Sequence, residues 1–88
     1  MYNIGNVIHI ISYLNNDSLY HIEQVMSKAH TFNKHTPLSK IIYTKNMLLG
    51  HNKQIYMLHE FNPKISNYYQ HKMYNCIYHL DTCIQSHT

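Results

Sequence analysis

Arginine and tryptophan are absent from this 88-residue sequence, and aspartate and glutamate together number four. All seven basic residues are lysines, and they are spread along the chain without forming a run. Without arginine, the chain cannot make the bidentate contacts with phosphate or guanine that dominate nucleic-acid recognition. The formal net charge of +3 comes mainly from the scarcity of carboxylates. We therefore expect no binding to nucleic acid.

Glycine is nearly as scarce, with two residues in the whole chain. Two glycines cannot build the glycine-rich loops that cradle phosphates or dinucleotides. The four carboxylates are far apart in the sequence, and no nucleophile elbow is present. The sequence thus predicts a non-enzymatic protein that uses no cofactor.

No apolar run approaches the ~18–20 residues of a membrane-spanning helix. The N-terminal apolar stretch has no preceding lysine or arginine, which argues against a signal peptide. Hydrophobic residues make up 44% and charged residues 12% of the chain, a composition too apolar for disorder. We predict one soluble domain over residues 1–88 that is intracellular, cytoplasmic or nuclear, and not bound to a membrane.

Cysteines and histidines gather near the C-terminus, at Cys76, His79, Cys83 and His87. These residue types suit zinc, but on one helix Cys76 and His87 would lie ~16 Å apart along the axis. Only an i, i+4 pair such as His79 and Cys83 could share a metal ion, and established zinc-site spacings are absent. Cys76 and Cys83 would lie ~10 Å apart, too far for a disulfide. We predict no metal site, free thiols, and no role for His79.

Three capping signals predict three helix starts. Residues 15–18 offer side-chain oxygens as N-caps, Thr36 caps a helix with Pro37 in its first turn, and Asn62 with Pro63 repeats that device. Gly50 occupies a position typical of the C-terminal cap of the second helix. Apolar residues recur at helical spacing behind each start. They are Leu19, Ile22, Val25, Met26 and Ala29, then Leu38, Ile41, Ile42, Leu48 and Leu49, then Ile65, Tyr69, Met73, Cys76, Ile77, Leu80 and Ile84.

Two segments are ambiguous. Residues 7–14 (VIHIISYL) fit either a strand or a helix, and residues 53–60 (KQIYMLHE) fit either a short strand or an irregular helix. Strands at 6–13, 40–44 and 53–60 with helices at 17–31 and 63–85 would form an α+β ferredoxin-like sandwich. That order loosely resembles the flavin-binding blue-light sensor domain, but its glycines, Thr-Gly turn and arginine are missing, so we expect no flavin.

The first half of the chain resembles an F-box over residues 2–43. Ile11-Ser12-Tyr13-Leu14 matches the end of the family's first helix, Leu19 its turn leucine, and Val25 its following valine. Leu38 matches the leucine that opens the third helix. The chain departs from the pattern at the early Leu-Pro, which is Tyr2-Asn3 here, and at both tryptophans, which are replaced around Ala29-His30 and at Ser39.

This resemblance implies a protein-interaction module that docks on the Skp-type adaptor of a cullin-RING ubiquitin ligase. It favours a helix at 7–14 and a mainly α domain, in which residues 44–88 form an accessory segment ending in a long helix at 63–85. The implied partner-binding residues are Ile10, Ile11, Tyr13, Leu14, Leu19, Val25 and Leu38.

Nine tyrosines leave a further alternative open. Tyrosine is enriched in protein interfaces, but a small domain without tryptophan can also use it to fill its core. A homo-oligomer built through the methionine- and tyrosine-rich last helix is therefore a second possible function. The sequence leaves the oligomeric state undecided.

Overall fold

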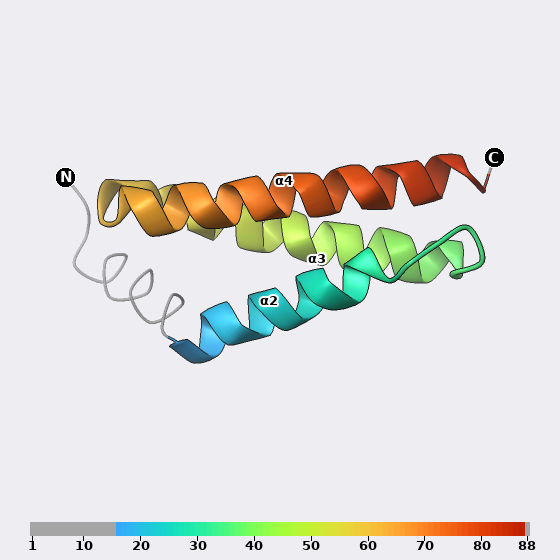
Figure 1. Cartoon of the computed structure of the whole chain (residues 1–88), viewed down its shortest axis with the longest axis horizontal. Helices are drawn as coiled ribbons and strands as arrows, with labels where there is room; N and C mark the ends of the chain where they lie inside the picture. Colours follow the sequence, from blue (N-terminus) through green and yellow to red (C-terminus); the bar gives the residue numbers. More distant parts are fainter. Residues whose placement is uncertain (1–15, 88) are drawn as a thin grey trace.

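The computed structural model describes residues 16–87, with side chains from residue 18 onward. Over this range the chain forms α2 (Asn16–His30), α3 (Leu38–Met57), a 3-10 turn η1 (Leu58–Glu60) and α4 (Pro63–Gln85). The three helices run back and forth along the long axis of the molecule, so that α2 and α4 are antiparallel to α3 (Figure 1). The predicted mainly α fold is confirmed, and α4 has the bounds that the sequence predicted.

The alternative α+β sandwich is wrong. Residues 40–44 lie inside α3, and residues 53–60 form the end of α3 and η1, so no strand occurs in the described part of the chain. Both segments place one face on a helical core, which a period of 3.6 residues satisfies and a period of two does not. The question of strand or helix at 6–14 lies outside the described residues.

The core lies between the three helices, and most of it comes from the predicted apolar stripes. Ile22, Ile41, Leu48, Met73 and Leu80 have no exposed surface. Half-buried Val25, Tyr69, Ile77 and Ile84 pack around this cluster. The second stripe was predicted only in part, because Leu38, Ile42 and Leu49 are about 40% exposed, at 39, 41 and 39%.

The second helix does not end at Gly50, as the sequence predicted. It continues for seven residues to Met57, and this extension places Ile55 in the core with no exposed surface. Burying Ile55 contributes roughly 1.5–3 kcal/mol, more than the ~1 kcal/mol that glycine costs inside a helix. The helix then tightens into η1, and the carbonyl of Leu58 accepts hydrogen bonds from the N–H groups of Phe61 and Asn62.

The two proline-containing helix starts differ. Asn62 caps α4 as predicted: its side-chain oxygen accepts from the Ile65 N–H at 3.2 Å, and Pro63 is the first helical residue. Thr36 does not cap α3, because Pro37 itself occupies the N-cap position. The Thr36 hydroxyl oxygen instead accepts from the Asn33 N–H at 3.0 Å and closes the loop between α2 and α3.

Candidate functional site

The C-terminal cysteines and histidine bind the end of α2 to α4. The carbonyl oxygen of Phe32, just beyond α2, lies 2.8 Å from His79 Nε2 and 3.5 Å from Cys83 Sγ. Because a carbonyl only accepts, His79 must carry a proton on Nε2. Cys76 Sγ donates to the carbonyl of Met26 at 3.7 Å. His79 therefore has a structural role that the sequence did not predict.

The same cluster offers little for metal binding or nucleophilic chemistry. His79 Nε2 and Cys83 Sγ lie 3.7 Å apart, but both already contact the Phe32 carbonyl. No group of three or more potential ligand residues meets around one point within residues 16–87. Both cysteines are free, as predicted, and both are buried. Burial raises the pKa of the Cys76 thiol to about 11. A thiol with that pKa is protonated and unreactive near neutral pH.

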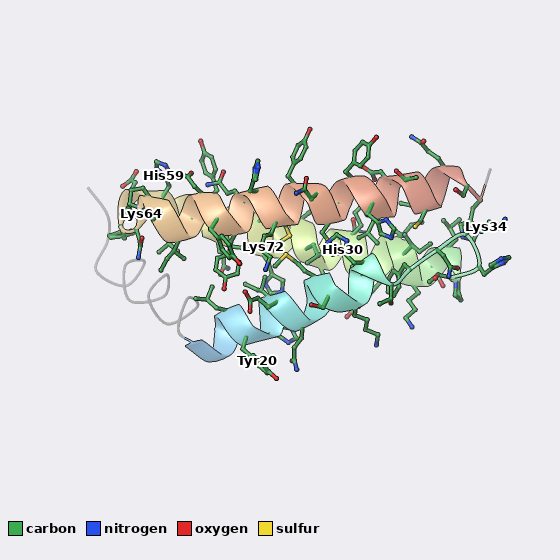
Figure 2. All side chains as sticks on the ribbon, viewed as in Figure 1. Tyr20, His30, Lys34, His59, Lys64 and Lys72 are labelled. Atoms are coloured by element: carbon green, nitrogen blue, oxygen red, sulfur yellow. The ribbon has the colours of Figure 1, made fainter. Side chains whose placement is uncertain are left out.

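A second polar network joins α2 to α4 nearer the other end of the bundle. The Tyr69 hydroxyl donates to Glu23 Oε1 at 3.1 Å, and Lys72 Nζ lies 3.6 Å from the same oxygen. Lys72 extends from α4 toward α2 (Figure 2). Burial, followed by the contact with the Glu23 carboxylate, raises the pKa of Tyr69 to about 12. This tyrosine therefore holds its proton at neutral pH and serves to connect the two helices.

An apolar hollow of about 220 Å³ lies between α2 and α3, and we call it the α2–α3 hollow. It is lined by Val25, Lys28, Phe32, Lys40, Tyr43, Thr44 and Met47. Lys40 Nζ lies 5.5 Å from the centre of the Phe32 ring. Two lysines and no carboxylate line this hollow, so the charges at its edge are positive.

The implied partner-binding residues fall in different places. Ile10, Ile11, Tyr13 and Leu14 lie outside the described residues. Val25 lines the α2–α3 hollow.

Leu19 and Leu38 do not line the α2–α3 hollow. Leu19 is half-buried and, six residues from Val25, is turned by about 120° around the α2 axis. Leu38 is 39% exposed at the first position of α3. Sequence reasoning did not assign Tyr43 and Met47 to the hollow, although their i, i+4 spacing places them on one face of α3.

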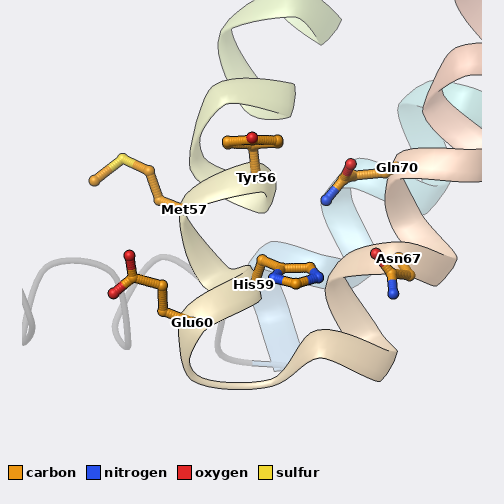
Figure 3. A pocket seen from close by; sticks show the side chains of 6 residues that line it. All are labelled: Tyr56, Met57, His59, Glu60, Asn67 and Gln70. Carbon is orange, nitrogen blue, oxygen red and sulfur yellow. The ribbon is translucent and has the colours of Figure 1, made fainter.

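A groove follows the seam between α3 and α4, and we call it the α3–α4 groove. Its two parts have volumes of about 340 and 360 Å³ and share Gln70. The first part, at the end where α3 turns into α4, is shown in Figure 3. It is lined by Tyr56, Met57, His59, Glu60, Asn67 and Gln70. The second part is lined by Leu49, Asn52, Gln70, Met73, Tyr74, Ile77, Tyr78 and Asp81.

Most tyrosines of the described part lie on the surface rather than in the core. Tyr20, on α2, points away from the bundle (Figure 2). Tyr69 is the half-buried exception. The tyrosines that are at least half exposed are Tyr20, Tyr43, Tyr56, Tyr68, Tyr74 and Tyr78. Tyrosine is therefore not the core filler of the described bundle.

Comparison with known proteins identifies no relative: no family model, no curated protein and no solved structure matches this chain. None of the helices within residues 16–87 is both long enough and apolar enough to span a membrane. The features that stand out in the described range are two depressions: the mainly apolar α2–α3 hollow, and the α3–α4 groove, whose lining mixes tyrosines and aliphatic side chains with polar ones.

Proposed function

We propose that this protein is a non-enzymatic interaction module that docks another protein at the α2–α3 hollow. The F-box resemblance suggests the Skp-type adaptor of a cullin-RING ubiquitin ligase as that partner. The observation that carries the proposal is the α2–α3 hollow itself, an apolar depression rimmed by lysines, with Val25 among the residues that line it.

The chemistry of the hollow defines the partner segment that fits it. Tyr43 is 68% exposed at its edge, and tyrosine supplies large contact area at low cost in side-chain entropy. An apolar anchor from the partner would contact Val25 and Met47, and acidic residues beside that anchor would meet Lys28 and Lys40. The expected partner surface is thus apolar at its centre and acidic around it.

The first test is isothermal titration calorimetry of the purified protein with a purified Skp-type adaptor. One-to-one binding at micromolar affinity or tighter supports the proposal. Because two exposed lysines contribute, the affinity should fall as salt is raised through the range in which surface charges become screened. Absence of binding by a protein that is folded by circular dichroism overturns the choice of adaptor.

Charge-reversal substitutions test whether the partner docks at the α2–α3 hollow. Lys28→Glu with Lys40→Glu should weaken adaptor binding by roughly tenfold or more, because two rim contacts become repulsive. The matched control reverses Lys34 and Lys64, two exposed lysines at opposite ends of the bundle (Figure 2). Both double variants have the same net charge, so equal weakening by the two would count against the hollow as the docking site.

A further inference from the structure

We infer that the α3–α4 groove is a self-association surface, and that two copies of this chain pair through it as a symmetric dimer. The groove lies on α3 and α4, whereas the α2–α3 hollow is formed by α2 and α3, and the two sets of lining residues share no member. The inference is therefore independent of the proposed adaptor docking.

The groove and the side chains that could fill it lie on the same face. Tyr74 and Tyr78 line the groove from α4 and are 74 and 71% exposed. A cavity of roughly 150 Å³ holds one benzene ring, so the part of about 360 Å³ has room for two aromatic rings. A two-fold axis requires each copy to present both the protruding and the receiving surface, and this face presents both.

The exposed apolar area approaches what a stable dimer requires. Tyr56, Tyr74 and Tyr78 are each about 70% exposed, at 68, 74 and 71%, and together leave on the order of 400 Å² of aromatic surface in solvent. Leu49 lines the groove, and Ile42 lies seven residues before it and so on the same side of α3; at 39 and 41% exposure they raise the total exposed area to roughly 550 Å². A standard interface buries ~800 Å² per partner, and the polar groups along the groove supply the remainder.

The charges of the α3–α4 groove disfavour an acidic partner, because Glu60 and Asp81 line it and no lysine does. Asp81, at one end of the groove, is already paired with Lys45 at 2.6 Å, so this end is close to neutral. Glu60 lies at the other end, about 22 Å along the bundle from Lys45 by helical rise. An antiparallel two-fold axis brings opposite ends together, so Glu60 of each copy would face the neutral Lys45–Asp81 pair of the other copy rather than a second Glu60. At the α2–α3 hollow, by contrast, Lys28 and Lys40 of one copy would face the same two lysines of a second copy and repel them.

Sedimentation equilibrium of the full chain over a wide concentration range tests the inference. We expect the mass to rise from that of the 10.6 kDa monomer to twice that value, with a dissociation constant in the micromolar range. A monomer mass at all concentrations up to about 1 mM, where even a weak contact of ~4 kcal/mol is half formed, overturns it.

Substitutions on α4 then test whether the two copies meet at the α3–α4 groove. Tyr74→Lys with Tyr78→Lys should weaken self-association by about tenfold or more, because two cations would replace the rings at a closely packed interface. Tyr20→Lys with Tyr43→Lys is the matched control, because it adds the same two charges at tyrosines that are 64 and 68% exposed and do not line the groove. Equal weakening by the control overturns the choice of face. Tyr78→Ala, which removes the ring without adding charge, keeps the test valid if the double variant loses its helical circular dichroism.

Discussion

Ser66 has no exposed surface, yet it is polar and lies where α3 and α4 meet. Its hydroxyl donates to the carbonyl of Ile55 at 2.7 Å and accepts from Gln70 Nε2 at 2.8 Å. A buried hydroxyl is tolerated only when it is hydrogen bonded, and here both its donor and its acceptor capacity are used. Ser66 therefore fixes the distance between the two helices that form the α3–α4 groove.

Ser66→Ala is expected to lower the free energy of unfolding by about 1–2 kcal/mol, because the amide of Gln70 loses its partner and the link to Ile55 disappears. Urea denaturation followed by circular dichroism measures this change. Ser27→Ala, at an exposed position of α2, is the control and should change stability by less than about 0.5 kcal/mol. An equal effect of the two substitutions would contradict the bridging role of Ser66.

At the scale of elements, α3 is a helix that continues through a residue expected to end it. Gly50 is exposed, its φ is not positive, and a Cβ atom placed on it would meet nothing within 4 Å. Neither a positive φ nor a close contact requires glycine at this position, and glycine gives the unfolded chain more backbone freedom than another residue would.

Gly50→Ala should raise the free energy of unfolding by about 0.5–1 kcal/mol, the difference in helix propensity between the two residues. Thermal and urea denaturation provide the measurement. Asn46→Ala, at another exposed position of α3, should give a smaller gain. Destabilisation by Gly50→Ala would show that the chain does not continue as an α-helix at this point.

At the scale of the whole molecule, stability on the alkaline side depends on protons that the folded state holds more tightly than the unfolded chain does, those of Cys76, Tyr69 and Lys72. The hydrogen bond with Tyr68 is the main cause that raises the pKa of Lys72. The pKa of Cys76 rises from 9.0 to about 11 through burial, and that of Tyr69 rises from 10.0 to about 12 through burial and the Glu23 carboxylate. Above pH 9 the unfolded chain releases these protons first, so the folded state binds more protons than the unfolded state. The free energy of unfolding should therefore fall as pH rises from about 9 to about 12, and should not depend on these groups below pH 9.

Tyr69→Phe should remove part of this decline, specifically between pH 10 and about 12. Urea midpoints measured across that range give the slope directly. Tyr20→Phe, which alters an exposed side chain, should leave the slope unchanged. If the slopes of the Tyr69→Phe protein and of the unsubstituted protein coincide, the Tyr69–Glu23 contact does not persist in solution.

The start and the buried face of α4 could be predicted from the sequence because both depend on residues close together in the chain. Asn62 and Pro63 set the start of α4, and the apolar period from Met73 to Leu80 identified its buried face, because capping and amphipathicity depend only on near neighbours in the chain. The end of α3 could not be predicted in this way. Gly50 is a local stop signal, and it is overridden by the burial of Ile55 against the other helices.

The sequence alone determined where the last helix begins and ends and that the two thiols are free, since these follow from spacing along one chain. It favoured a mainly helical fold but left an α+β sandwich open, and the structure decided between the two by placing residues 40–44 inside α3. Only the tertiary structure decided which apolar residues face solvent. Ile41 and Ile42 are adjacent and chemically identical, yet one is fully buried and the other 41% exposed, because α2 and α4 cover one side of α3 and leave another open. The same packing created the α2–α3 hollow and the α3–α4 groove, whose walls come from helices distant in sequence, which no periodicity within a single helix can reveal.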